Sequence, residues 1–167
     1  MPSPEATRQS ALIEEAIAAA REEDFLRALT LFLDVYGGDE KSSKRTPKEG
    51  KGLSFFGLSL ALVRKEMKPA IDLCRRAIEL EFYNGDHYAN LARVYAAAGN
   101  RKKAIETAEQ GLKLAPDHDY LIAVRKSFGV RSEPYVPFLT RRNPINVSLG
   151  QARHAKKIAE AERRKKS

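Results

Sequence analysis

Apolar residues recur at intervals of three and four from near the N-terminus to Phe128, which is the period of an amphipathic helix. The clearest stretch, 88–114, is interrupted by the turn-forming pair Gly99-Asn100 and is followed by Pro116, which cannot continue a helix. Its apolar positions are Tyr88, Leu91, Ala92, Tyr95, Ala104, Ile105, Ala108, Leu112 and Leu114. This pattern predicts a helical hairpin.

The hairpin pattern occurs three times along the chain. The segment that begins with Ala70-Ile71 recurs at Ala104-Ile105, an offset of 34 positions. A weaker copy containing Ala28-Leu29 precedes Ala70 by 42 positions, and the additional eight fit the polar stretch 37–50, which has the composition of a solvated loop. We therefore expect hairpins over about 9–36, 51–84 and 85–118.

The spacing of residues within the copies resembles the tetratricopeptide repeat (TPR), whose pattern is W-x2-L-G-x2-Y, then A-x3-F, then P. The third copy matches well, the second has Phe82 in place of the proline, and the first is degenerate. The matching positions are Tyr88, Leu91, Ala92, Tyr95, Ala104, Ala108 and Pro116 in the third copy; Phe56, Gly57, Leu60, Ala70 and Cys74 in the second; and Leu12, Glu15, Ala16, Ala19, Ala28 and Phe32 in the first.

The second copy is longer than the third by a single residue. The step from Gly57 to Ala70 is 13 positions, whereas the equivalent step from Ala92 to Ala104 is 12 positions. We place this insertion in the turn around residues 64–68.

The resemblance implies an all-α, right-handed superhelical solenoid of TPR-like hairpins. Small residues at 57, 70, 92 and 104 allow neighbouring helices to approach closely, and each hairpin needs stacked neighbours to bury its apolar face. Tyr120, Leu121, Val124 and Phe128 stand at helical spacing before Gly129, which predicts a capping helix over 119–128. The solenoid is thus expected to span 9–128.

A different pattern follows the repeats. Pro134, Pro137 and Pro144 disfavour a long helix over 129–150, so we expect an extended strap with several apolar residues. Two interpretations remain open: the strap packs on the solenoid, or a partner protein recognises it in extended form. Residues 151–167 are rich in helix-forming and basic residues but carry little apolar area, which predicts a frayed basic tail.

The charge is distributed unevenly over the 167 residues. The overall net charge is +8, but the segments carry −6 over 1–40, +5 over 41–84, 0 over 85–124 and +9 over 125–167. The excess of positive charge therefore belongs to the part of the chain after the repeats. A single cysteine, no signal-like start and no apolar run long enough to span a bilayer together predict a cytoplasmic protein without an intrachain disulfide.

Motifs that carry chemistry are not found in the sequence. Neither G-x-G-x-x-G nor G-x4-G-K-S/T occurs, and His87, His118 and His154 have no further ligand at metal-binding spacing. Cys74 stands at a position that packs between helices, where we expect a buried small hydrophobe rather than a reactive thiol. We therefore expect no cofactor, no metal and no enzymatic activity.

The resemblance to TPR proteins implies that the first helix of each hairpin lines a groove that binds a peptide or helix of another protein. Carried onto this chain, the groove positions are Asn90, Arg93, Ser54, Phe55 and Leu58. The alternative for Asn90 and Arg93 is that they are simply solvated. The function expected is a non-enzymatic protein–protein interaction adaptor or assembly scaffold.

A second hypothesis rests on the basic tail. Its cations could contact the phosphates of a nucleic acid, as in a ribonucleoprotein-associated accessory protein, or an acidic protein, and binding would weaken steeply with salt. A solvated tail without a partner is the third interpretation. The residues concerned are Arg141, Arg142, Arg153, Lys156, Lys157, Arg163, Arg164, Lys165 and Lys166.

Overall fold

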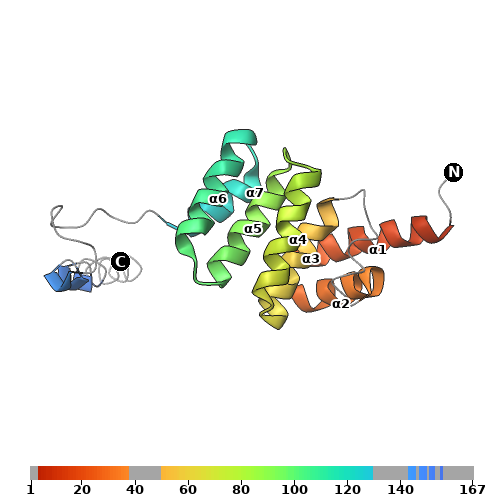
Figure 1. Cartoon of the computed structure of the whole chain (residues 1–167), viewed down its shortest axis with the longest axis horizontal. Coiled ribbons are helices and arrows are strands. Elements are labelled where there is room, and N and C mark those ends of the chain that lie inside the picture. The colour runs from red at the N-terminus through yellow and green to blue at the C-terminus, as the bar shows by residue number, and fades with distance from the viewer. Residues whose placement is uncertain are drawn as a thin grey trace, which may run out of the picture. The chain divides into compact units, whose positions relative to one another are not determined.

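The computed structural model describes residues 4–37 and 50–129 and, further on, residues 143–145, 147–149, 151, 152 and 155. The chain divides into two compact units, 1–129 and 130–167. The regular elements described in the first unit are all helices (Figure 1). They are α1 (Pro4–Arg21), α2 (Phe25–Tyr36), α3 (Gly50–Ser59), the π-helical η2 (Leu60–Arg64), α4 (Met67–Leu80), α5 (Gly85–Ala97), α6 (Arg101–Leu114) and α7 (Asp119–Ser127).

The helices pair into three hairpins, α1/α2, α3/α4 and α5/α6, and α7 packs on α5 and α6. The turn of each hairpin contains one residue with a left-handed backbone: Glu23 (φ 64°), Lys65 (φ 61°) and Gly99 (φ 74°). These residues are 42 and 34 positions apart, the same offsets that relate the sequence repeats. The expected all-α repeat solenoid is confirmed, and the three turns have equivalent geometry although only one of them contains glycine.

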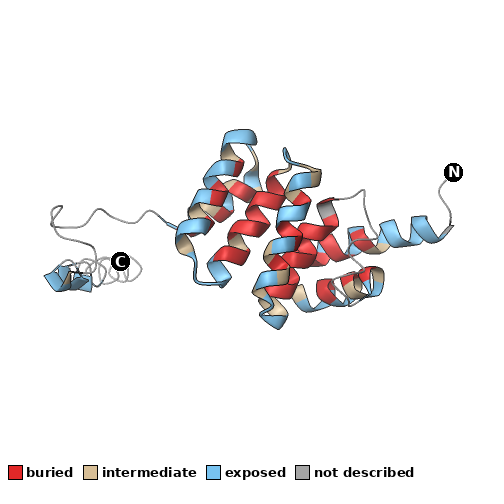
Figure 2. Ribbon diagram, in the orientation of Figure 1, coloured by how far each residue is buried: buried red, intermediate tan, exposed pale blue. Residues whose placement is uncertain are grey.

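The small residues of the repeat lie where helices approach most closely. A Cβ atom on Gly57 would stand 2.7 Å from the carbonyl oxygen of Ala70. Ala92 and Ala104 are fully buried, and so is Cys74, as expected from its place in the repeat. Burial raises the pKa of the Cys74 thiol, which keeps it protonated and unreactive. Figure 2 shows the result, with α3 and α5 buried along most of their length.

An aromatic cluster joins the first hairpin to the second. The ring of Phe32 on α2 lies 6.0 Å from that of Tyr36 and 5.6 Å from that of Phe56 on α3, measured between centroids. Tyr36 and Phe56 are themselves 5.4 Å apart, and all three residues are buried. These contacts bury the apolar face that the degenerate first copy cannot cover alone.

The one-residue insertion of the second copy lies in a helix, not in the turn where the sequence placed it. Lys65 and Glu66 occupy the same turn positions as Gly99 and Asn100 of the next copy, so the turn itself contains no additional residue. The helix before it is π-helical over Leu60–Arg64. A π-helical turn holds one residue more than an α-helical turn, so the insertion is absorbed without shifting the residues on either side.

The second unit differs from the extended strap expected over 129–150, as far as it is described. Residues 144, 145 and 147–149 are helical. Asn143 begins this turn: its side-chain oxygen accepts from the backbone N–H of Ile145 at 3.0 Å, and its carbonyl accepts from that of Val147 at 3.0 Å. Pro144 then stands at the first helical position, where a missing N–H costs nothing. The expectation of extended backbone is therefore wrong at these residues; 130–142 lie outside the described residues.

Candidate interaction site

The five predicted groove positions lie on α3 and α5, but four of them are not exposed. Ser54, Phe55, Leu58 and Asn90 have no accessible surface, and only Arg93, with 23% of its side chain exposed, reaches solvent. The structure brings Ser54 and Asn90 together, since the Asn90 Nδ2 donates to Ser54 Oγ at 3.1 Å. The alternative of simple solvation does not describe either α5 residue, because both are engaged in side-chain contacts.

Arg93 and Asn90 both bind Tyr120 on α7. The Tyr120 hydroxyl donates to the Asn90 side-chain oxygen at 3.1 Å and accepts from Arg93 at 3.0 Å. Arg93 also donates to Glu23, in the turn between α1 and α2, at 3.0 Å, and its guanidinium lies 5.2 Å from the centre of the Phe25 ring. One face of α5 is thus linked to both ends of the solenoid.

Asp86, one helical turn before Asn90, extends this face. Its carboxylate accepts from Arg21, the last residue of α1, at 2.8 Å, and lies 3.4 Å from Nε2 of His118, the residue that caps α7. Because the Nδ1 of His118 accepts from the backbone N–H of Leu121, its Nε2 carries the proton and faces Asp86. We call Asp86, Asn90 and Arg93 the inner stripe.

Sequence reasoning missed the residues that bind the inner stripe, namely Arg21, Glu23, His118 and Tyr120. One signal was available: Asp86 and Tyr120 are separated by the repeat offset of 34 positions, so the repeat places both on the same face of successive first helices. Arg21 and Glu23 gave no such signal, because they are 65 and 70 residues from their partners. Their side chains remain 56% and 70% exposed, whereas those of Asp86 and Arg93 are 6% and 23% exposed, so each ion pair joins an exposed residue of the first hairpin to a largely buried residue of α5.

Beneath the stripe, a line of polar groups connects the buried residues Ser54 and His87 to the half-buried Glu81. The distance from Ser54 Oγ to His87 Nδ1 is 2.9 Å, and that from His87 Nε2 to Glu81 Oε2 is 3.1 Å. Burial raises the pKa of Glu81, but hydrogen bonds from Asn84 and His87 outweigh burial and hold that pKa below its ordinary value. Burial lowers the pKa of His87, although Glu81 and Asp86 act in the opposite direction. His87 is therefore neutral near pH 7, with Nε2–H donating to Glu81 and Nδ1 accepting from Ser54.

The order Ser–His–Glu invites comparison with a hydrolase triad, but the geometry serves packing. Ser54 Oγ is buried and also accepts from Asn90, so no substrate carbonyl can approach it in this arrangement. Among the described residues, no group of three His, Cys, Asp or Glu side chains is placed to hold a metal ion. The arrangement can fix the register of α3 against α5, which is the role we assign to it.

We expect the free energy of unfolding to fall as the pH is lowered from 7 to 5. Unfolded His87 has a pKa of about 6.5 and takes up a proton in this interval, whereas the folded side chain, whose pKa burial lowers, binds less of that proton at each pH. The unfolded state then binds more protons, so stability rises with pH and is lost on acidification. Urea unfolding at several pH values should show a shallower slope for His87→Gln. The same slope in both proteins would contradict this assignment.

Other expectations fall on residues that are not described. The basic positions Arg141, Arg142, Arg153, Lys156, Lys157 and 163–166 all lie outside the described residues. Within the part of the chain that the structure covers, no helix is both long and apolar enough to cross a membrane.

No protein-family model and no curated protein matches the sequence. Solved structures do match. An O-GlcNAc transferase mutant of Thermobaculum terrenum is similar over 77% of this chain (TM-score 0.60, 23% identity), which spans only 23% of the transferase. The Sgt2 TPR domain of Aspergillus fumigatus matches 84% of the chain and 94% of its own length (TM-score 0.55, 14% identity). The first TPR of Spaghetti (RPAP3), bound to the HSP90 peptide SRMEEVD, matches 73% and 90% (TM-score 0.53, 14% identity). At these identities the likeness shows a shared fold.

Proposed function

We propose that this chain, which has the tetratricopeptide-repeat fold, is a cytoplasmic, non-enzymatic adaptor or assembly scaffold that binds a peptide or helix of another protein along the inner stripe. The observation that carries the proposal is the occupation of this stripe by two ion pairs whose outer members, Arg21 and Glu23, come from the chain's own first hairpin and are exposed. The TPR domain of Spaghetti holds a peptide, which supports a peptide partner by analogy of fold.

The geometry favours replacement of Arg21 and Glu23 by groups of a partner protein. Arg21 and Glu23 are more than half exposed, so a partner can replace them without opening the core. An incoming peptide that offers acceptors to Arg93 recovers the hydrogen bond that Glu23 gives up, and the pair itself contributes only about 0–1 kcal/mol. Ser54, Phe55, Leu58 and Asn90 then act from beneath, by holding α3, α5 and α7 in register.

We expect two substitutions in the same ion pair to have opposite effects on partner capture. Arg93→Ala removes the group that binds the partner and should lower recovery at least about fivefold, the effect of losing one charge-assisted hydrogen bond. Glu23→Ala removes the internal competitor and should raise recovery. Both break the Glu23–Arg93 ion pair, and Arg93→Ala also removes the contacts with Tyr120 and Phe25. A loss of stability would lower recovery in both variants, so it cannot produce opposite signs. The measurement is quantitative affinity capture from nuclease-treated lysate, followed by mass spectrometry.

The control is Arg76→Ala, because Arg76 also forms an ion pair, 2.9 Å long and more exposed, with Glu79 on α4, the second helix of its hairpin. It should leave recovery unchanged. Capture that is identical in the Arg93→Ala and wild-type proteins, or that recovers only nucleic acid before nuclease treatment, argues against the proposal.

A further inference from the structure

A cavity of about 350 Å³ lies between α4 and α6, with α5 as its floor. Its floor is formed by Tyr88, Leu91 and Tyr95, which are on the side of α5 away from the inner stripe, since Tyr88 stands two residues from both Asp86 and Asn90. Ile78 of α4 forms an apolar wall. The volume suits a large side chain or a small ligand.

Two hydroxyl groups line this cavity without partners. Tyr88 and Thr107, which is on α6, are 2% and 9% exposed, and their hydroxyl oxygens are not fully enclosed by protein atoms. Among the described residues, neither hydroxyl makes a hydrogen bond, whereas the neighbouring Tyr95 hydroxyl accepts from Arg75 at 2.9 Å. Both oxygens can therefore pair with a group that enters the cavity. The cavity thus suits an occupant that has an apolar body and a tip able to donate and accept hydrogen bonds.

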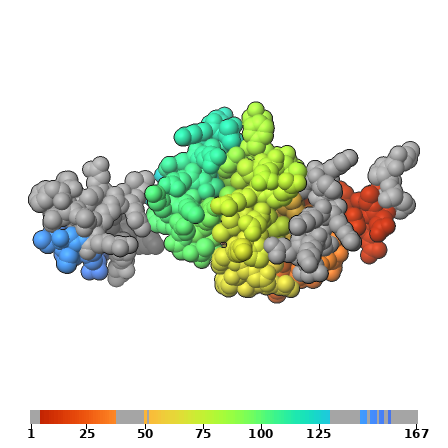
Figure 3. Space-filling view, viewed as in Figure 1, coloured from red at the N-terminus to blue at the C-terminus, as the bar shows by residue number. Residues whose placement is uncertain are grey.

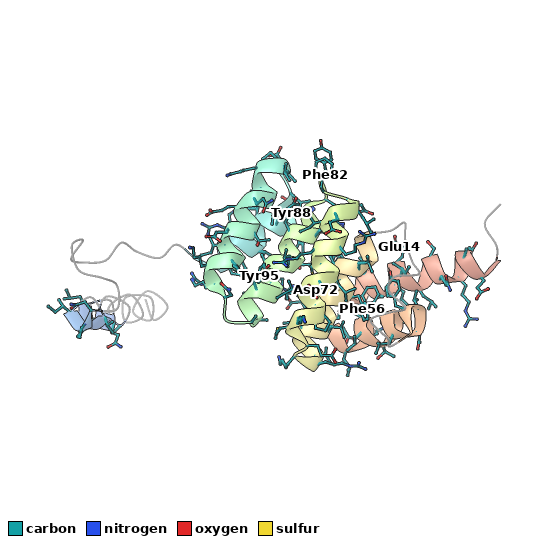
Figure 4. All side chains as sticks on the ribbon, in the orientation of Figure 1. Glu14, Phe56, Asp72, Phe82, Tyr88 and Tyr95 are labelled. Carbon is teal, nitrogen blue, oxygen red and sulfur yellow. The ribbon has the colours of Figure 1, made fainter. Side chains whose placement is uncertain are left out.

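The same chain exposes a side chain of this kind in the turn that joins two helices of the cavity, α4 and α5. In the turn between α4 and α5, Phe82 and Tyr83 are 50% and 68% exposed, and their rings lie 3.7 Å apart between centroids. Figure 4 shows Phe82 projecting beyond the end of α4, at the end of α5 nearer to Tyr88, and the turn forms a protrusion in Figure 3. Tyr83 follows Glu79, a residue of the cavity rim, by four positions.

We propose that a second copy of the chain inserts Tyr83 into this cavity, and that two copies do so reciprocally about a two-fold axis. A phenol has an apolar ring, which matches Ile78 and Leu91, and a hydroxyl that can accept from one cavity hydroxyl and donate to the other. A two-fold contact requires a surface that is complementary to itself. A protruding residue and a receiving cavity that share the helices α4 and α5 can provide such a surface. The contact leaves the inner stripe accessible, so dimerisation and partner binding are compatible.

The first test is sedimentation velocity of the full chain over a range of protein concentrations at moderate salt. We expect a monomer–dimer equilibrium whose dissociation constant rises at least about tenfold in Tyr83→Ala, as for an aromatic hot spot. Thr107→Val keeps the shape of the side chain and removes its hydroxyl, and should weaken the dimer by a smaller factor. Leu26→Ala changes an equally exposed apolar residue on α2 and should have no effect.

The second test places a reporter at the contact, because the chain has no tryptophan. In Tyr83→Trp, the indole emission should shift to shorter wavelength, and acrylamide quenching should decrease, as the concentration rises through the dimer range. A monomer at all concentrations, or a dimer that Tyr83→Ala leaves unchanged, overturns the proposal. A dimer in which the indole stays as accessible as in the monomer also overturns it, because Tyr83 is then outside the cavity.

Discussion

Replacing Phe32 by alanine should lower the free energy of unfolding by about 3–5 kcal/mol, since it empties a fully buried site that collapses poorly. Phe32 stacks on Tyr36 and lies against Phe56 of the next hairpin, so its loss also weakens the attachment of the first hairpin. In a repeat solenoid each hairpin is stabilised mainly by its neighbour. Urea unfolding followed by circular dichroism should therefore show a lower midpoint and a broader transition, as the first hairpin unfolds separately.

A matched substitution on the same helix separates burial from helix propensity. Leu26 is 66% exposed, so Leu26→Ala should change the free energy of unfolding by no more than about 0.5 kcal/mol. If the two variants were equally stable, the aromatic cluster could not be what attaches the first hairpin to the second.

Gly111→Ala should destabilise the protein by about 1–3 kcal/mol, although alanine is the better helix former. A Cβ atom at this position would lie 2.5 Å from Cβ of Tyr88, 2.7 Å from Cγ of Tyr88 and 2.9 Å from Leu121 of α7. The first two atoms are close to the backbone of α5 and cannot move aside as a side-chain tip can. The sign of the change is therefore set by packing between α5, α6 and α7.

The control for this variant is its neighbour. Gln110 is exposed on the same turn of α6, so Gln110→Ala should be neutral or slightly stabilising. Equilibrium unfolding of both proteins at concentrations where the chain is monomeric provides the measurement. A Gly111→Ala protein more stable than wild type would show that α7 is not held against α6 as closely as the distances indicate.

The repeat architecture could be predicted because it rests on local patterns. The spacing of Tyr88, Leu91 and Ala104 encodes which face of each helix is buried, and the offset of 34 positions encodes how hairpins stack. The extra residue of the second copy was also visible as a difference in spacing. Its position was not visible in the sequence. One additional residue between Gly57 and Ala70 can be held by a π-helical turn or by a longer loop, and the spacing is the same in both cases.

The candidate site was predicted less well, since it depends on distant parts of the chain. Asn90 and Arg93 both contact Tyr120 from α5, whereas from the sequence they were expected to line an open groove or to be simply solvated. Glu23 and Tyr120 reach it from opposite ends of the solenoid. The curvature of a solenoid is the sum of small rotations between successive hairpins, so the sequence of a single repeat does not reveal which distant residues meet.

The sequence by itself therefore determined the helices, their pairing into hairpins and the residues that form the core, because helical period and side-chain size are local properties. Only the tertiary structure decided which polar residues meet. It places Arg21 on Asp86, Glu23 on Arg93, and Ser54 on Asn90. These pairs form where the packing of the hairpins brings side-chain atoms from distant parts of the chain within about 3 Å of one another. Hydrogen bonds act only over such short distances, so they cannot be inferred without that geometry.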